Sequence, residues 1–339
     1  MLRSLIRSVY EDDVPPPQSD EAYADALRRL EAAGIAPQLH ALLKRRGALS
    51  DMPPPFRERL ETLAKAALYR NLFLKRQGER ILSAFEASGI DVMPLKGVWF
   101  SEAYFGHPGA RESSDIDLLV RRDDMERAAG LVHELGFEAE DDRQIRGHFH
   151  TTLTMPLPGS PVPHIAELHW HIMRPETAAI RMEGIWSAAA ELPGMRHVKG
   201  LSDDDAFYLI CLHGWRHNMD SLKYHLDIMQ MIFVLKDRLS YETLLRRAAE
   251  ERTYKRIVRA LSIVYRDFPF LQTVKPFPAF RAPRWRDCGG AGPPAGSWRR
   301  YADLLDYQLF SYDCARHRLI ALKEWLGELA AGSADNEGR

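Results

Sequence analysis

The sequence predicts an α+β protein in which a small mixed sheet is flanked by N- and C-terminal helical regions. Apolar residues recur at helical spacing before residue 89 and again after residue 176. Between them, short apolar or alternating segments are typical of strands. Strand, helix, strand, helix, strand, strand is the order of a small α/β unit. We expect a helical region at 1–88, an α/β core at 89–175, a helical domain at 176–330 and a disordered tail at 331–339.

The first region is expected to contain two clear helices. Ser19 is placed to cap the first one, and Gly34 to end it. A longer helix is predicted from about Arg57 to Ala87. Its apolar residues are Leu60, Leu63, Ala67, Leu68, Leu72, Leu74, Ile81, Leu82 and Phe85.

The core region is expected to alternate between strands and helices. Helices are predicted at 98–105 and 122–137, the second ended by Gly136. Leu168 and Trp170 are expected on the buried face of the last strand, because side chains alternate between the two faces. The predicted strands cover 89–95, 115–120, 149–155 and 164–172, and the last two are joined by a Pro-rich connection.

The C-terminal region reads as helices separated by one long loop. The loop at 283–298 is rich in Gly and Pro. Helical periodicity covers 203–218, 221–238, 240–268 and 298–329.

Composition and the absence of certain motifs exclude several classes of protein. Lys plus Arg number 46 and Asp plus Glu number 47, which argues against a long nucleic acid as substrate and against binding to a membrane surface. The three cysteines are far apart, as expected for reduced thiols in a cytoplasmic protein. No apolar run is long enough to cross a membrane. Neither a P-loop nor a serine-hydrolase elbow is present, and Cys211 reads as a core residue.

Two carboxylates begin the second predicted strand, in the stretch RESSDIDLLV. Asp115 and Asp117 are two residues apart, so they face the same side of the strand, while Ile116 and Leu118 face the core. Adjacent carboxylates repel each other unless they are solvated or a cation neutralises them. Hard divalent cations take such oxygen ligands together with substrate phosphates. The pair therefore indicates a metal site, with a solvated strand end as the alternative.

Two further segments support the metal site. Lys96 and Gly97 lie between a predicted strand and a predicted helix. The N-terminus of a helix and a lysine ammonium both favour the binding of a phosphate group. The alternative is a plain turn with a surface lysine. Glu167 and His169 share one face of their predicted strand with His171. A carboxylate on a neighbouring strand would complete a three-acid site, whereas the alternative is a half-exposed strand with polar residues toward solvent.

Together, the segments PLKG, GARESSDIDLLV and AELHW resemble the nucleotidyltransferases of the DNA polymerase β superfamily. The closest resemblance is to a bacterial branch of uncharacterised nucleotidyltransferases, in which Lys-Gly replaces Gly-Ser and Glu-Leu-His-Trp supplies the third acid. The segment 221–232 also resembles the helix that follows in that branch. The resemblance covers residues 89–235 and implies a polymerase-β-like core.

The resemblance implies roles for individual residues. Mg²⁺ or Mn²⁺ would be bound by Asp115, Asp117 and Glu167, the last as ligand or as base for the acceptor hydroxyl. The residues near the nucleotide would be Lys96, Gly97, Arg111, Ser114, His169, Lys223 and Asp227. Here Lys-Gly replaces Gly-Ser, the interval from Gly97 to Asp115 is longer than in polymerase β, and the third acid is Glu rather than Asp. These departures leave the triphosphate geometry open.

Two other groups of residues leave alternatives open. The histidines could instead form a zinc or iron hydrolase site, although no H-E-x-x-H pattern is present; they are His148, His150, His164, His169 and His171. The segment 213–227, with His213, Arg216 and His217, either lies beside the active site or forms a solvated helix pair.

The predicted reaction is metal-dependent transfer of an NMP from an NTP to an acceptor hydroxyl, with release of pyrophosphate. ATP is the expected nucleotide, and the acceptor would be a small molecule, a peptide or a protein. The alternative is a catalytically silent relative that binds a nucleotide or a biosynthetic partner. A silent site has no need for three acids, which favours the enzyme.

Overall fold

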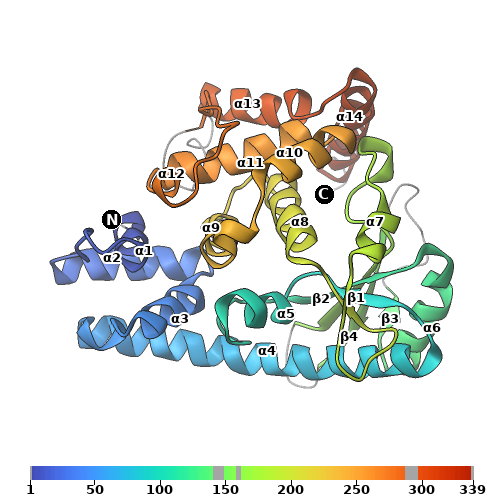
Figure 1. The fold of residues 1–339 in the computed structure, drawn as a ribbon, viewed down its shortest axis with the longest axis horizontal. Coiled ribbons are helices and arrows are strands. Elements are labelled where there is room, and N and C mark those ends of the chain that lie inside the picture. Colours follow the sequence, from blue (N-terminus) through green and yellow to red (C-terminus); the bar gives the residue numbers. More distant parts are fainter. Residues whose placement is uncertain (1, 140–148, 158–161, 287–296, 337–339) are drawn as a thin grey trace. The chain divides into compact units, whose positions relative to one another are not determined.

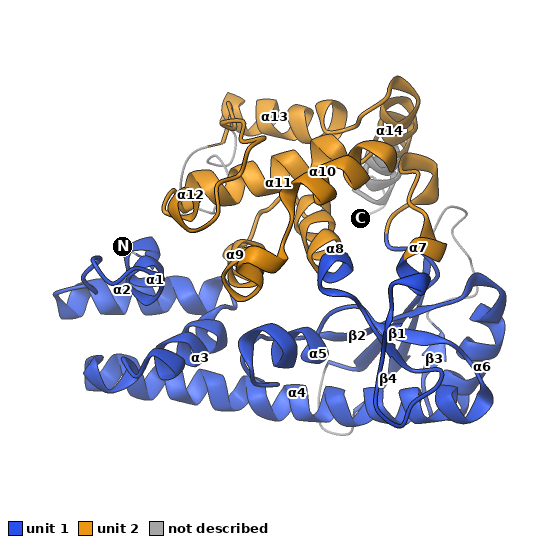
Figure 2. Cartoon of the chain, viewed as in Figure 1, with its two compact units in different colours: residues 1–172, 185–206 blue, residues 173–184, 207–339 orange. Residues whose placement is uncertain are grey.

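The chain forms two compact units (Figure 2). The computed structural model describes residues 2–139, 149–157, 162–286 and 297–336. Unit 1 comprises residues 1–172 and 185–206, and unit 2 comprises residues 173–184 and 207–339. The expected four-part division of the chain stays a prediction. Among the described residues, no helix combines the length and apolarity that a membrane span requires.

Unit 1 begins with short helices that precede one long helix (Figure 1). The predicted Ser19 cap is present, since its hydroxyl accepts a hydrogen bond from the Ala22 N–H at 3.2 Å. The first three helices are α1 (Leu2–Tyr10), α2 (Asp20–Ala32) and α3 (Ala36–Arg46).

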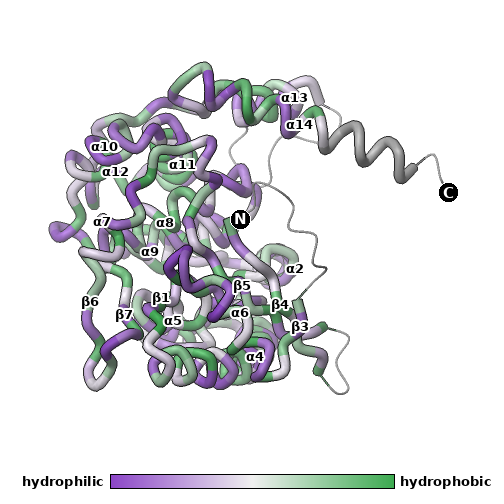
Figure 3. The backbone as a smooth tube through the Cα atoms, turned by 90° about the vertical axis from the view of Figure 1, so that its right-hand side faces the viewer, coloured by the Kyte–Doolittle hydropathy of each residue, from purple (hydrophilic) through white to green (hydrophobic). Residues whose placement is uncertain are grey.

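The long helix α4 spans Pro54–Ser88 and ends at Gly89, which adopts the left-handed conformation. Seen nearly end-on, this helix carries both hydrophobic and hydrophilic residues (Figure 3). Its buried stripe differs from the predicted one: Leu63 and Leu68 are only half-buried. Leu72 is 44% exposed, and Asn71 takes the buried position in that turn. The reason is spacing, because position 71 lies four residues after buried Ala67 and three before buried Leu74.

The mixed sheet has the strand order β1-β2-β5-β4-β3. β2 and β5 pair in parallel, whereas the β1–β2, β4–β5 and β3–β4 pairs are antiparallel. This confirms the predicted α+β fold. The strands are β1 (Val92–Pro94), β2 (Asp115–Val120), β3 (Glu138–Ala139), β4 (His150–Met155) and β5 (His164–His169).

One face of this sheet is covered by α4 and by α6 (Met125–Glu134). Ile116 and Leu118 of β2 and Leu168 of β5 belong to the shared hydrophobic core, as their alternation predicts. The opposite face carries Asp117 and Glu167. The predicted helix at 98–105 consists of α5 (Val98–Phe100) and a π-helical turn (Ser101–Phe105).

The last strand of the sheet is shorter than predicted. β5 ends at His169, so Trp170 leaves the strand and is half-buried rather than buried. The guanidinium of Arg122 lies 4.4 Å from the centre of the Trp170 ring. A separate two-stranded sheet of β6 (Ala190–Glu191) and β7 (Lys199–Gly200) was not expected from the sequence.

Unit 2 is helical, and α7 and α8 each contain a boundary between the units. The predicted helix at 240–268 breaks at Arg252, whose φ of 60° lies in the left-handed region. α14 continues to Asn336, so residues 331–336, which were expected to be disordered, are helical; their composition does not explain this. The helices are α7 (Met182–Ser187), α8 (Asp203–Arg216), α9 (Leu222–Leu235), α10 (Tyr241–Glu250), α11 (Tyr254–Asp267), α12 (Leu271–Val274), α13 (Trp298–Leu305) and α14 (Ala315–Asn336).

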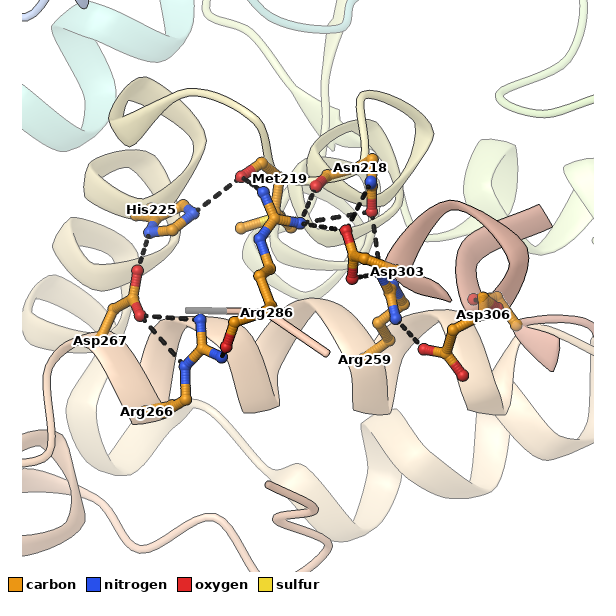
Figure 4. Close-up of polar contacts among 10 residues, drawn as sticks. Asn218, Met219, His225, Arg259, Arg266, Asp267, Arg286, Asp303 and Asp306 are labelled. Carbon is orange, nitrogen blue, oxygen red and sulfur yellow. Dashed lines mark hydrogen bonds and ion pairs between the residues drawn. The ribbon is translucent and has the colours of Figure 1, made fainter. Parts of the chain in front are cut away.

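A buried ionic network stabilises the turn between α8 and α9 (Figure 4). Asn218 and Met219 in this turn both have positive φ, a conformation that costs free energy for residues other than glycine. Arg286 donates hydrogen bonds to the carbonyl oxygens of both residues. Asp303 accepts hydrogen bonds from Arg259 at 2.7 Å and from Asn218 at 3.1 Å.

Candidate active site on the polar face of the sheet

The acidic residues of the sheet meet because β2 and β5 are parallel neighbours. Asp117 lies directly opposite Glu167 in this pairing. Paired residues point to the same face, so both carboxylates project from the face opposite α4 and α6. Ligand atoms of Asp117, Glu167 and His169 all lie within 4.8 Å of one another.

Lys96 lies at the centre of this acidic group. Its Nζ is 2.5 Å from Asp117 Oδ2 and 3.1 Å from Asp115 Oδ2. The side chain is only 14% exposed, so Lys96 is not the surface lysine of the alternative reading. Burial lowers the pKa of Lys96, but the charges of the two aspartates raise it by more, so the ammonium stays charged.

His169, which lies on β5, bridges the carboxylates of Asp117 and Glu167. Its Nε2 lies 3.2 Å from Asp117 Oδ1 and 3.1 Å from Glu167 Oε2. Burial lowers the pKa of His169, but its hydrogen bonds to Asp117 and Glu167 raise it by more. Burial raises the pKa of Asp117, but the charge of Lys96 and the His169 hydrogen bond bring it below its ordinary value. The Lys96 ammonium and the His169 contacts thus offset the repulsion between the converging carboxylates.

The pKa of Glu167 shows the same balance of effects. Burial raises it, but the hydrogen bond and charge of His169, together with the charge of Lys96, lower it from 4.5 to about 2. The Glu167 carboxylate therefore stays ionised in the folded protein at neutral pH. A site built in this way can hold a divalent cation only in exchange for part of its internal ion pairing.

Gly97 allows two segments of the site to approach closely. Its φ of +75° lies in the left-handed region, and a Cβ there would lie 3.3 Å from the carbonyl oxygen of Asp115. The same Cβ would lie 3.8 Å from Ser113 Oγ, a buried hydroxyl with no hydrogen-bond partner among the described residues. Sequence reasoning selected Ser114, which is exposed. Alternation could have indicated Ser113, which is two residues before Asp115 and four before Asp117.

Other predicted site residues have different surroundings. Arg111 is buried, and its guanidinium lies 5.5 Å from the centre of the Phe100 ring. Lys223 and Asp227 belong to α9 of unit 2, where Asp227 is buried. The roles of these three residues toward a nucleotide stay predictions.

The histidines of the predicted hydrolase alternative are distributed over both faces of the sheet. His150 lies opposite His169, with 5.0 Å between the ring centres, whereas His164 points to the core side. His171 follows the end of β5, and His148 lies outside the described residues. Within the described residues, the group of ligand atoms that could hold a metal contains one histidine, His169.

The donor atoms of this group fit a divalent cation. Carboxylate oxygens from Asp117 and Glu167 suit Mg²⁺ and Mn²⁺, and the imidazole nitrogen of His169 suits softer first-row metals. Such a mixed set of donors admits Mn²⁺ as well as Mg²⁺. The carboxylate of Asp115 reaches the same region through its contact with Lys96.

Changing Glu167 to Gln should flatten the acid side of the stability curve of the metal-free protein. A folded-state pKa of about 2 means that ionised Glu167 stabilises the native state above about pH 4.5. This contribution is lost as the pH falls toward 2, and the variant has no such contribution to lose. Urea unfolding in EDTA at several pH values between about 5 and 2 measures the free energy of unfolding. Exposed Glu176 changed to Gln is the control, and equal acid slopes in wild type and Glu167→Gln would contradict the prediction.

Comparison with known proteins gives one match. A family model described as "Uncharacterised nucleotidyltransferase" matches residues 19–268, which is more than half of the 339 residues. The matched range contains Lys96, both aspartates of β2, Glu167 and His169. No curated protein and no solved structure matches the chain significantly.

Proposed function

Because the chain belongs to the uncharacterised nucleotidyltransferase family, we propose that it transfers an NMP from an NTP to an acceptor hydroxyl with release of pyrophosphate. ATP is the first nucleotide to test. The acceptor is proposed to be a small molecule, a peptide or a protein, because the balanced charge of the chain does not favour a long nucleic acid.

One observation carries this proposal: Asp117 and Glu167 lie opposite each other on parallel strands, with Asp115 on the same face of β2. Three carboxylates on one face of the sheet form a costly arrangement unless other groups offset their charge. In the metal-free protein the Lys96 ammonium and the contacts of His169 with Asp117 and Glu167 offset it. A site of this kind is suited to exchanging internal ion pairs for a divalent cation and the phosphates it carries.

In the proposed reaction, Asp115, Asp117 and Glu167 would hold a divalent cation, Mg²⁺ or Mn²⁺. When bound, the cation would supply charge neutralisation at the reacting phosphate and lower the pKa of the attacking hydroxyl. The Lys96 ammonium, which pairs with the carboxylates in the metal-free protein, would then pair with the triphosphate. Glu167, at the more exposed end of the group, is a ligand or accepts the proton of the acceptor hydroxyl.

Lys96→Met is expected to have opposite effects on metal and on nucleotide. Without the ammonium, a divalent cation has no internal competitor at Asp115 and Asp117, so Mn²⁺ should bind more tightly in the absence of NTP. The KM for NTP should rise, because the triphosphate loses a cationic partner. Calorimetric titration with Mn²⁺ and steady-state kinetics measure the two effects. Exposed Lys65 changed to Met is the control, and a loss of Mn²⁺ affinity in Lys96→Met would contradict the exchange of cations.

The proposed function is tested by incubating the protein with each NTP, Mg²⁺ or Mn²⁺ and a native-host extract. Pyrophosphate release together with an acceptor heavier by one NMP supports the proposal. Mass spectrometry of the products identifies the acceptor. Absence of pyrophosphate release with all four nucleotides and both metals would contradict it.

The same contacts also favour a second candidate, a catalytically silent protein that binds a nucleotide or a partner. The Lys96 ammonium and the His169 contacts already offset part of the charge of the carboxylates without a metal ion. In that case NTP binds without pyrophosphate release, and calorimetry combined with the assay above distinguishes the two.

A further inference from the structure

Asn71 is a polar residue in the buried stripe of a long amphipathic helix. The other buried residues of α4 are apolar or glycine, and Asn71 is completely buried among them. Burying an amide without hydrogen-bond partners is costly, so a buried asparagine requires partners that satisfy its donors and its acceptor. Those partners indicate what the residue does.

All the partners of Asn71 are backbone groups of one loop. Its Nδ2 donates hydrogen bonds to the carbonyl oxygens of Pro108 at 2.6 Å and Arg111 at 2.7 Å. Its Oδ1 accepts a hydrogen bond from the Ser113 N–H at 3.2 Å. One side chain thus binds both ends of the segment 108–113, across 42 residues of sequence.

The same loop is held tightly at two further points. A Cβ on Gly109 would lie 2.8 Å from the Cα of Leu68, so this glycine packs directly on the backbone of α4. Ser101 Oγ accepts a hydrogen bond from the Arg111 N–H at 3.0 Å and donates one to the carbonyl oxygen of His107 at 2.7 Å. The path of the loop is therefore defined before the chain reaches β2.

This loop leads directly to Asp115. Asp117 lies inside β2 and is paired with Glu167, so the sheet itself holds it. Asp115 is the first residue of the strand, so its pairing with Ile165 ends the ladder on that side, and the loop 108–113 precedes it by one residue. Its carbonyl oxygen also packs against Gly97, which leaves little room for a shifted path.

We propose that Asn71 is a positioning residue: by holding the loop 108–113 against α4, it places the Asp115 carboxylate beside that of Asp117 for joint binding of a divalent cation. The proposal rests on the proposed function for the identity of what the carboxylates bind. Asn71 acts through the loop backbone and not through contact with the metal or the nucleotide.

The test measures Mn²⁺ affinity of the folded full-length protein by electron paramagnetic resonance. Asn71→Ala should bind Mn²⁺ about 10–100-fold more weakly than wild type, the range typical of residues that orient metal ligands. Leu60→Ala is the matched control, since Leu60 is also fully buried on α4 and belongs to the same stripe. It should unfold at a lower temperature but keep wild-type Mn²⁺ affinity. Wild-type affinity in Asn71→Ala would overturn the proposal.

A double mutant separates positioning from general loss of stability. If Asn71 acts through Asp115, adding Asn71→Ala to Asp115→Asn should weaken Mn²⁺ binding by less than about twofold. A full additional 10–100-fold loss would overturn the proposed route. If Asn71→Ala does not fold, Asn71→Ser, which keeps a shorter donor and acceptor, should show an intermediate loss of affinity, and wild-type affinity in that variant would likewise overturn the proposal.

Hydrogen exchange distinguishes failure of this inference from failure of the proposed function. If wild-type protein binds no Mn²⁺, the metal-dependent function is contradicted. In that case faster exchange of the Ser113 amide in Asn71→Ala would still support the positioning of the loop, because this amide donates to Asn71 Oδ1. Unchanged exchange would overturn it.

Discussion

Asp117→Asn is expected to reduce nucleotidyl transfer by about a thousandfold or more. If Asp117 is a metal ligand as proposed, its loss removes several kcal/mol of transition-state stabilisation by the metal, and each 1.4 kcal/mol corresponds to about tenfold in rate. Asp117 has the largest effect because it is completely buried and contacts both Lys96 and His169. Steady-state kinetics with saturating Mn²⁺ and NTP measure the loss.

Stability of the metal-free protein provides a second measurement on the same variant. Repulsion among the acids alone predicts that removing one of them is stabilising. The ion pairs predict the opposite, because Lys96 is buried and loses its closer carboxylate while keeping Asp115. We expect the free energy of unfolding to fall, by up to about 3–5 kcal/mol as for other broken buried pairs.

The control for Asp117→Asn is the same change at Asp123. This residue is exposed in the turn that follows β2, so activity and stability should stay at wild-type values. Activity of Asp117→Asn within tenfold of wild type would contradict its role as a metal ligand. Before kinetics are compared, circular dichroism should establish that the variant is folded.

Asp303→Ala is expected to destabilise unit 2 by about 3–5 kcal/mol. Its carboxylate is 6% exposed and lies between Arg259 and Arg286, which are also buried. Without it, two guanidinium groups that cannot lose their protons face each other in the protein interior. Arg286 also donates to the carbonyl oxygens of the turn with positive φ, so that turn should lose its support (Figure 4).

Asp306→Ala is the matched control for this prediction. Asp306 also pairs with Arg259, but its side chain is 39% exposed, so its removal should cost less than about 1 kcal/mol. Equilibrium unfolding in urea measures both variants. Equal losses for Asp303→Ala and Asp306→Ala would contradict the importance of burial in this network.

The sequence by itself determined which side chains share a face. Residues two apart in a strand point the same way, so Asp115 with Asp117, and Glu167 with His169, could be grouped from local alternation. The same kind of reasoning located the long helix to within a few residues, because apolar spacing and Gly89 are local signals.

Only the tertiary structure decided how these segments meet. Asp117 and Glu167 are 50 residues apart in sequence, and no local pattern specifies that β2 and β5 pair in parallel with this register. Likewise, the sequence indicated that Lys96 lies near a phosphate or, as the alternative, at the surface, whereas in the structure it lies between two carboxylates. The position of a long side chain depends on the charges that folding brings to it.

Asn71 illustrates the same limit at a single position. In the sequence it interrupts an apolar pattern, and Leu72 was the natural choice for the buried face. In the structure, buried Asn71 satisfies backbone groups of a loop that is about 40 residues away in the chain. A buried polar side chain is tolerated only when it has hydrogen-bond partners. The sequence does not show the partners of Asn71, because they come from another part of the fold.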